Sequence, residues 1–142
     1  GGNGQKMGSL EPEETPQMTL RTCTSSCSKE DLPVTLDANW RWVHDGSGTN
    51  CYKGSEWDKK LCPDPTTCAE KCHLEGVNAN QYSETYGVSE IDGGLQLDFL
   101  KETAYGTNVG SRLYLMQDED SYKIFKLKNR EFSFTVDVSH VP

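Results

Sequence analysis

The six cysteines are the residues whose number and spacing most directly predict chemistry. An even number is typical of a chain held by disulfides in an oxidising compartment. Their spacing favours local or nested bridges, although sequence alone permits other pairings: Cys23 with Cys27, Cys51 with Cys72, and Cys62 with Cys68. A zinc site is the alternative, because Cys68 and Cys72 would share a helical face. No pair has the usual C-x2-C spacing, however, and the histidines are scattered, so we expect no metal and no cofactor.

Trp40 and Trp42 are the second chemical feature, because paired aromatic rings can pack a core or form a flat binding surface. From Leu32 to His44, apolar residues alternate with polar ones. This is the period of two that a half-buried strand shows, so both tryptophans are expected on one strand face. From the pattern alone, a role in the core is the commoner outcome for tryptophans placed in this way.

Short strands are expected to position these residues. We interpret residues 1–16 as an extended or poorly ordered arm and residues 17–142 as one domain portion, with a strand beginning at Met18. One short helix is predicted, with Asp64 as its N-cap, Pro65 in its first turn and its end near Gly76. Turn signals then separate candidate strands at 82–88, 95–100, 111–116, 122–127 and 131–138. This regular spacing predicts an all-β sandwich or barrel.

Composition and charge limit the partners that the chain can have. It has 142 residues, a hydrophobic fraction of 34% and a formal net charge of −8. A negative surface repels nucleic acid, and no apolar run reaches the roughly 20 residues that crossing a bilayer requires. We therefore expect neither nucleic acid nor a membrane as a partner. The two ends, Gly1-Gly2-Asn3 and Val141-Pro142, resemble those of an excised fragment.

Several motifs occur in an order that resembles one known family. They are Asp-Ala-Asn-Trp-Arg-Trp-Val-His at 37–44, Asn-Cys-Tyr at 50–52, Leu-Cys-Pro-Asp at 61–64, Thr-Cys-Ala at 67–69, Thr-Tyr-Gly-Val at 85–88, Asn-Val-Gly-Ser-Arg-Leu-Tyr-Leu-Met at 108–116 and Glu-Phe-Ser-Phe-Thr-Val-Asp-Val at 131–138. In order and spacing they resemble the N-terminal part of the cellobiohydrolases of glycoside hydrolase family 7. The resemblance runs from about Gln5 to the last residue, and motifs in a fixed order are a specific signal.

The resemblance implies a concanavalin-like β-jelly roll, an antiparallel sandwich of which this chain is the N-terminal portion, with one short disulfide-tethered helix. It implies a secreted, extracellular cellulase that hydrolyses β-1,4-glucosidic bonds with retention and is a monomer when complete. Retention needs two carboxyl groups about 5 Å apart. The family's Glu-x-Asp-x-x-Glu motif is absent, because Leu61 and Leu95 stand where the second glutamate of the nearest approaches should be. No catalytic residue is therefore expected in this chain.

The resemblance also indicates which residues bind substrate. Glucose offers a C–H face to an aromatic ring and a rim of hydroxyls to planar polar groups. Trp40 and Trp42 match two sugar-stacking platforms of the family, and a further set matches positions that line or support the same path: Asn39, Tyr52, Asn108 and Arg112, with Tyr86 as an additional candidate. The alternatives are a surface ion pair for Arg112, a turn for Asn108 and a cover over the Cys51 disulfide for Tyr52. Trp57 either packs the cysteine-rich loop or touches sugar.

The expected partner is cellulose or another β-1,4-glucan. Loops at 50–57 and 101–108 are long enough to resemble tunnel-forming loops, which favours exo-action over endo-action. Leu20 and His73 depart from the family pattern, which usually has tryptophan and cysteine at these positions. The alternative function is a non-catalytic β-glucan-binding protein that kept the aromatic platform and lost the chemistry.

Overall fold

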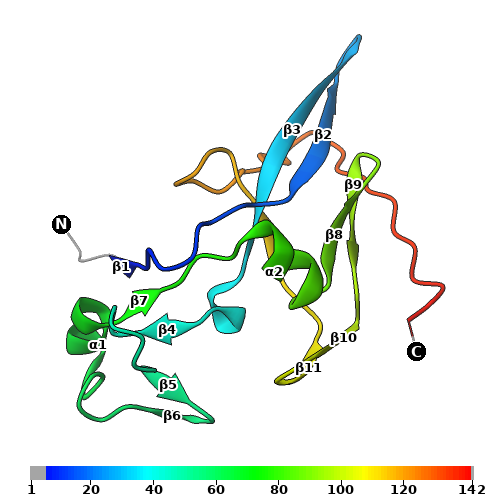
Figure 1. Ribbon diagram of the computed structural model, residues 1–142. Helices are drawn as coiled ribbons and strands as arrows, with labels where there is room; N and C mark the ends of the chain where they lie inside the picture. Colours follow the sequence, from blue (N-terminus) through cyan, green and yellow to red (C-terminus); the bar gives the residue numbers. More distant parts are fainter. Residues whose placement is uncertain (1–5, 142) are drawn as a thin grey trace.

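The computed structural model describes residues 6–141, which form many short strands and two short helices (Figure 1). In chain order the elements are β1 (Lys6–Met7), β2 (Gln17–Cys23), β3 (Cys27–Leu36), the 3-10 turn η1 (Ala38–Trp40), β4 (Val43–His44), β5 (Tyr52–Lys53), β6 (Glu56–Trp57), α1 (Pro65–Lys71), β7 (His73–Leu74), α2 (Ala79–Glu84), β8 (Val88–Ile91), β9 (Gly94–Leu97), β10 (Leu100–Thr103), β11 (Gly106–Val109) and β12 (Leu113–Leu115). The all-β class is confirmed. Within residues 6–141, neither helix has the length and apolar content needed to cross a membrane.

The hairpin of β2 and β3 is the longest element and projects from the rest of the molecule (Figure 1). Its inner half carries Leu32, Val34 and Leu36, each no more than 4% exposed, while the half near the Cys23–Cys27 turn is exposed on both faces. β12 pairs with the inner half of β3 and completes an antiparallel sheet of three strands. Alternating burial therefore holds only where β3 crosses the core.

The core is small and lies where the end of β3 meets α2 and β8. Leu36, Val77, Tyr82 and Val88 are each no more than 2% exposed. Partly buried side chains pack around this cluster, namely Trp40, Tyr86 and Leu113. One face of the candidate binding region is thus built directly on the core.

The expected strand from Leu32 to His44 is wrong beyond Leu36. The carboxylate of Asp37 accepts the backbone N–H of Asn39 at 2.8 Å and caps η1, so the chain turns instead of continuing the strand. Short polar side chains compete with strand pairing in this way. The two tryptophans therefore do not share one strand face, because Trp40 ends η1 and Trp42 precedes β4.

Residues 82–88, expected as a strand, contain the end of a second helix instead. Asn78 and Gln81 form a capping box, in which each side chain accepts the other residue's backbone N–H at 2.9 Å, and α2 begins at Ala79. The helix after Asp64 begins as predicted, but it ends at Lys71 and not near Gly76. Strand β7 follows directly and pairs with both β1 and β4.

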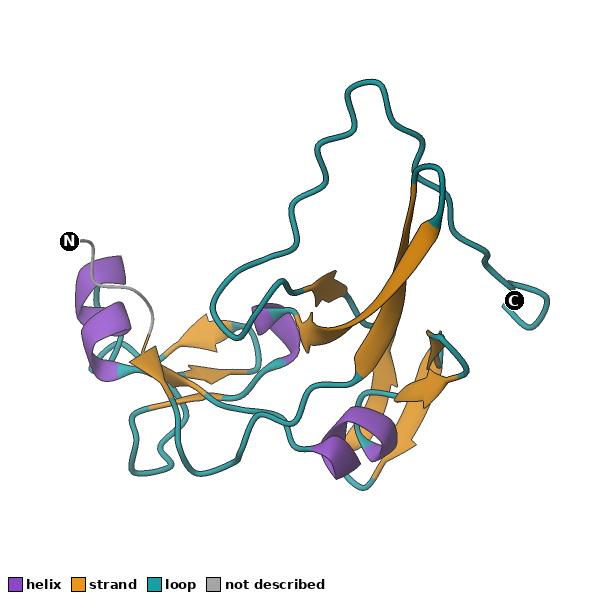
Figure 2. Cartoon of the chain, turned by 90° about the horizontal axis from the view of Figure 1, so that it is seen from above, coloured by secondary structure: helices purple, strands orange, loops and turns teal. Residues whose placement is uncertain are grey.

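Two more expected strands, at 122–127 and 131–138, do not form. The turn between them is present, with Asn129 at a φ of 59° and Arg130 donating its N–H to the carbonyl of Leu127. Figure 2 shows the segment as a loop out to the C-terminus. Ile124 and Phe134 are 73% and 71% exposed. A strand needs a hydrogen-bonded neighbour, and among residues 6–141 only the Met116–Tyr122 bridge pairs with this segment.

All six cysteines form disulfides in the predicted pairs, Cys23–Cys27, Cys51–Cys72 and Cys62–Cys68. The sulfur atoms of Cys51, Cys62 and Cys72 lie within 4.8 Å of one another. Zinc needs thiolates, and these sulfurs are committed to disulfides. The cysteine-rich segment is therefore held by two adjacent cross-links.

Candidate functional site

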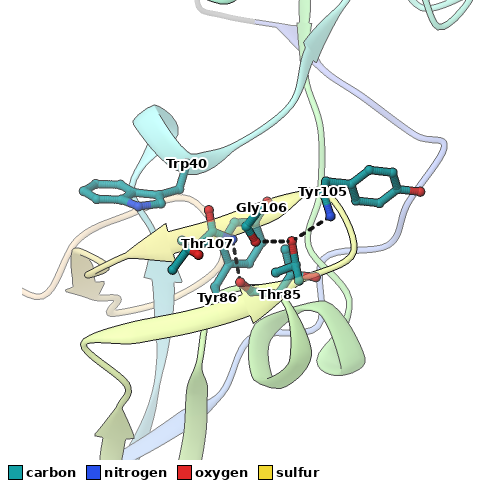
Figure 3. Close-up of a pocket in the computed structure, with 8 residues that line it drawn as sticks. Trp40, Thr85, Tyr86, Tyr105, Gly106 and Thr107 are labelled. Carbon is teal, nitrogen blue, oxygen red and sulfur yellow. Dashed lines mark hydrogen bonds between the residues drawn. The ribbon is translucent and has the colours of Figure 1, made fainter.

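An open pocket of about 280 Å³ lies between η1, the end of α2 and the hairpin of β10 and β11 (Figure 3). Trp40 forms one side of it, and Tyr86 and the hairpin form the other. The rest of its lining carries hydroxyl or amide groups or is glycine, and consists of Thr85, Thr103, Tyr105, Gly106, Thr107 and Asn108. Aromatic rings beside hydroxyl and amide groups are what a sugar ring requires.

The ring of Trp40 is held on two sides. Beneath it lies the core cluster, and the guanidinium carbon of Arg112 stands 5.7 Å from its ring centre. Arg112 donates from Nε to Asp37 at 3.0 Å. Arg112, and then the backbone N–H of Asn39, lower the pKa of Asp37 to about 2. Arg112 therefore forms the ion pair that was the alternative to a substrate-binding role, and it also lies against the tryptophan of the pocket.

The hairpin that closes the pocket is fixed by its polar side chains. Asn108 lies within β11, not in a turn, and its amide donates to the carbonyl of Thr85 at 2.6 Å, which ties the hairpin to the end of α2. At the tip, Thr103 donates to the carbonyl of Gly106 at 2.7 Å, and Gly106 has a φ of 133° that favours glycine. Tyr105 beside it points into solvent and away from Trp40 (Figure 3).

Trp42 lies outside this pocket, on the chain between η1 and β4. Its side chain is 40% exposed, and its indole N–H donates to the side chain of Asn50 at 2.7 Å. Its ring packs against His44 with the ring centres 4.1 Å apart. The indole is thus orientated by neighbours on one side and open to solvent on the other.

Tyr52 and Trp57 form a separate aromatic pair across the hairpin of β5 and β6. Their ring centres are 4.9 Å apart, and they are 44% and 51% exposed. Asn39 is exposed in η1, where its backbone N–H is used by Asp37. Of the residues that the sequence indicated, Trp40, Tyr86 and Asn108 therefore line the pocket and Arg112 adjoins it, whereas Trp42 and Tyr52 lie elsewhere.

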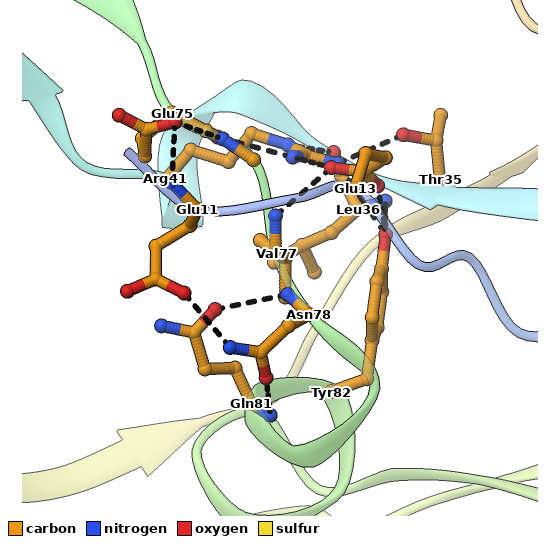
Figure 4. A network of polar contacts seen from close by, with 11 residues as sticks. Glu11, Glu13, Thr35, Leu36, Arg41, Glu75, Val77, Asn78, Gln81 and Tyr82 are labelled. Atoms are coloured by element: carbon orange, nitrogen blue, oxygen red, sulfur yellow. Dashed lines mark hydrogen bonds and ion pairs between the residues drawn. The ribbon is translucent and has the colours of Figure 1, made fainter. Parts of the chain in front are cut away.

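Behind the tryptophans, Arg41 is the centre of a polar network (Figure 4). Its guanidinium binds both carboxylate oxygens of Glu13, and its remaining hydrogen bonds go to the Leu36 carbonyl, the Glu75 carbonyl and the hydroxyls of Thr35 and Tyr82. Burial opposes ionisation of Glu13, but hydrogen bonds from Arg41 and Tyr82 hold its pKa below the ordinary value. Burial, and then Glu13, raise the pKa of Tyr82 to about 12.

Glu75 and His44 form a second buried pair nearby, 1% and 0% exposed. The backbone N–H of Gly46 donates to Nδ1 of His44, so the ring proton is on Nε2. The Nε2–H of His44 donates a hydrogen bond to the carboxylate of Glu75, with 2.6 Å between nitrogen and oxygen. Burial opposes ionisation of Glu75, yet backbone N–H groups of Gly76, Glu11 and Leu10, together with the His44 ring, hold its pKa below the ordinary value.

Because the folded-state pKa of Glu75 lies below its ordinary value of 4.5, the folded state binds fewer protons than the unfolded state does near that pH. The contribution of the Glu75 carboxylate to the free energy of unfolding is present above pH 4.5 and is lost as the pH falls through the folded-state pKa. Glu75→Gln places an amide donor among N–H donors and is expected to cost about 1–3 kcal/mol at pH 7. Urea unfolding of both forms should show this difference shrinking below about pH 4.5. A difference that is the same at pH 3 and pH 7 would contradict the expectation.

Sequence reasoning missed most of the polar framework. One of the turn signals between the candidate strands is Tyr-Gly-Thr-Asn at 105–108, but a turn signal alone does not identify the tip of a pocket-forming hairpin. Glu13, Tyr82 and Glu75 carried no local signal, because their partners lie 28 to 69 positions away along the chain. Strand pairing follows a regular pattern along the chain, but the partners in a side-chain network do not. The sequence therefore gives no rule by which these three residues could be found.

A family model described as glycosyl hydrolase family 7 matches residues 7–142 of this chain. A cellobiohydrolase of that family from Daphnia pulex is 40% identical, with a TM-score of 0.71 over 78% of this chain and 26% of that one. A cellobiohydrolase from Melanocarpus albomyces, solved with cellotetraose, is 44% identical with a TM-score of 0.71 over 80% and 26%. The Humicola insolens endocellulase EGI is 27% identical with a TM-score of 0.58 over 78% and 28%.

The chain thus combines an all-β fold with a pocket lined by aromatic, hydroxyl and amide groups. The match over residues 7–142 and the likeness to cellobiohydrolases show that the chain belongs to glycosyl hydrolase family 7. Its fold is part of the all-β jelly roll of that family. The chain spans about a quarter of the length of the solved relatives that it matches.

Proposed function

We propose that this chain forms part of the substrate path of a cellulase that hydrolyses β-1,4-glucosidic bonds of cellulose with retention. The pocket beside Trp40 carries the proposal, because an aromatic wall and a hydroxyl and amide rim together match both surfaces of a glucose ring. The cellotetraose in the Melanocarpus albomyces relative supports a cello-oligosaccharide as ligand. Three disulfides support a secreted protein, and we expect a monomer when it is complete.

Within that path the tryptophans act as platforms at two places. Trp40 serves the pocket, with Tyr86, Asn108 and Arg112 around it. Trp42, exposed and fixed by Asn50, serves a second place along the same glucan. Asn39 and Tyr52 are exposed, follow or precede these tryptophans closely in the sequence, and contribute polar contacts to the glucan.

Bond cleavage is assigned to residues other than those of this chain. The pocket lining is aromatic, hydroxyl, amide or glycine, and a retaining mechanism needs two carboxyl groups. Asp37, the carboxylate that Arg112 binds beside Trp40, is engaged by Arg112, Tyr114 and the backbone of Asn39. An acid held at a pKa of about 2 is a poor proton donor near neutral pH.

Exo-action is favoured over endo-action by two observations. The chain is 40% and 44% identical to two cellobiohydrolases and 27% identical to an endocellulase. The β10–β11 hairpin also stands beside the pocket, as a loop that encloses a substrate path would. The second candidate is a non-catalytic β-glucan-binding protein, which the non-acidic lining favours equally.

The binding proposal is tested by titrating the chain with cellohexaose in a calorimeter. Trp42→Ala is expected to weaken binding by about 1–3 kcal/mol, by analogy with aromatic stacking of bases, which is roughly five- to 150-fold. Trp57→Ala is the matched control, because it removes an indole from β6 that is somewhat more exposed, 51% against 40%, and it is expected to change affinity less than about twofold. Equal losses in both variants, or none in Trp42→Ala, would contradict the platform assignment.

A further inference from the structure

Arg41 stands between the two tryptophans in the sequence, and its side chain is directed away from them. Its backbone is extended, with a φ of −96° and a ψ of 149°, so adjacent side chains leave the chain on opposite sides. The side chain of Arg41 is 4% exposed, whereas the ring of Trp42 is open to solvent. Whatever fixes the guanidinium inside therefore also restricts the backbone from which the indole projects outside.

We propose that Glu13 is a positioning residue for glucan binding, which acts through Arg41 to orientate Trp40 and Trp42. The inference rests on the proposed function, because it assigns a determinant of the same binding surface. Glu13 belongs to the N-terminal segment before β2 and lies 28 positions from Arg41. Each of its two carboxylate oxygens accepts a hydrogen bond from a different nitrogen of the Arg41 guanidinium. This paired geometry defines an orientation as well as a distance.

The backbone on both sides of Arg41 is tied to the same network. The N–H of Arg41 closes η1 on the carbonyl of Ala38 at 3.0 Å, next to Trp40. The carbonyl of Trp42 accepts the N–H of Glu75 at 2.9 Å, and the carbonyl of Glu75 accepts from Arg41 at 3.2 Å. A shift of the guanidinium would therefore be transmitted to η1 on one side and to the Trp42 peptide on the other.

Glu13 also determines how the other members of the network are arranged. Tyr82 donates its hydroxyl proton to Glu13 at 2.7 Å, and the N–H of Val77 donates to the same carboxylate at 3.0 Å. The Glu13 carboxylate therefore accepts hydrogen bonds from Tyr82, Val77 and Arg41, and Arg41 is the cation that it pairs with. Glu13→Gln keeps the shape but replaces one acceptor oxygen with a donor, so the fork with Arg41 cannot form in full.

The neighbouring residue Glu14 provides a matched control. Its carboxylate accepts the N–H of Ala79 at 2.8 Å, at the first residue of α2, and it has the same charge. Glu14→Gln therefore changes net charge and arm composition equally, without altering a contact to Arg41. Thr35→Val is a milder variant of the network, since it removes only the hydroxyl that Arg41 binds at 2.9 Å.

The test combines cellohexaose affinity with the indole N–H signals of the three tryptophans in a ¹⁵N-labelled chain. Glu13→Gln should shift the signals of Trp40 and Trp42, leave that of Trp57 in place, and weaken cellohexaose binding about fivefold or more. Thr35→Val should give the same changes to a smaller extent. Glu14→Gln should leave the three signals and the affinity unchanged within about twofold. Circular dichroism of each variant establishes that it is folded before it is compared.

The outcomes separate this inference from the proposed function. A native chain that binds cellohexaose, with Glu13→Gln folded and unchanged in affinity and indole signals, overturns the positioning role alone. A shift of all three indole signals overturns it too, because a general loosening would not spare Trp57. If Glu13→Gln does not fold, Thr35→Val decides by the same two measurements. A native chain with no affinity for cellohexaose overturns the proposed function. In that case, indole signals of Trp40 and Trp42 that are unchanged in Glu13→Gln would overturn the positioning role as well.

Discussion

Replacing Arg41 with alanine is expected to lower the free energy of unfolding by about 3–5 kcal/mol. The side chain is 4% exposed and is the cation to which Glu13 binds. Its removal also leaves the carbonyls of Leu36 and Glu75 without the donor that reaches them in a buried place. Unsatisfied buried polar groups cost about 1–3 kcal/mol each. For a chain with a core this small, such a loss would leave a large fraction unfolded at ordinary temperature.

Urea unfolding followed by circular dichroism measures this loss. Arg21→Ala is the matched control, because it removes the same side chain from an exposed position on β2 and is expected to change stability by no more than about 0.5 kcal/mol. A loss below about 1 kcal/mol for Arg41→Ala would mean that water replaces the network at little cost. Comparing Glu13→Ala, Arg41→Ala and the double variant would then measure their coupling directly.

Removing the Cys51–Cys72 disulfide by replacing both cysteines with alanine is expected to destabilise the chain by about 3 kcal/mol or more. The bridge joins residues 21 positions apart, and both cysteines are no more than 1% exposed. Cross-linking restricts the unfolded chain by an amount that grows with the loop that it closes. The same change at Cys23 and Cys27, 4 positions apart at an exposed turn, is expected to cost about 2 kcal/mol.

Thermal unfolding of the two double variants under non-reducing conditions provides the comparison. Peptide mapping without reduction should first confirm that the remaining cysteines keep their pairs, because Cys62 and Cys72 lie close together at 3.4 Å between their sulfurs. Equal destabilisation in the two variants, or a larger one at the hairpin tip, would contradict this ranking. Such a result would indicate that the unfolded chain is already compact around the cysteine-rich segment.

The parts of the fold that were predictable from sequence are those governed by local rules. Asp64 and Pro65 set the start of α1, and the spacing of the cysteines gave all three disulfides. Alternation identified the inner half of β3 but could not show where the strand stops, because Asp37 caps a turn with the same polar-apolar pattern. The strands expected at 122–127 and 131–138 had the right composition, but strand formation depends on a partner that local sequence does not specify.

The candidate site was predictable to a smaller extent. The resemblance to a family indicated Trp40, Asn108 and Arg112, and the structure brings these three together. It also indicated Asn39, Trp42 and Tyr52, which do not line the pocket. The substrate-binding roles of all six residues stay predictions. The network behind the tryptophans has no local sequence signal, because Arg41 fits the alternating pattern as the polar residue between two aromatic ones. Its importance follows from where its side chain ends, which depends on segments far away in sequence.

The most direct measurement of the central claim is a titration of the ¹⁵N-labelled chain with cellohexaose, followed by NMR of both protein and sugar. Saturable shifts of the indole signals of Trp40 and Trp42, an unshifted Trp57 and cellohexaose that stays intact over days are the predicted result. They would show that the chain binds a β-1,4-glucan at these rings and supplies no cleavage. Release of cellobiose by the purified chain, or saturation without any shift at Trp40 and Trp42, would contradict it.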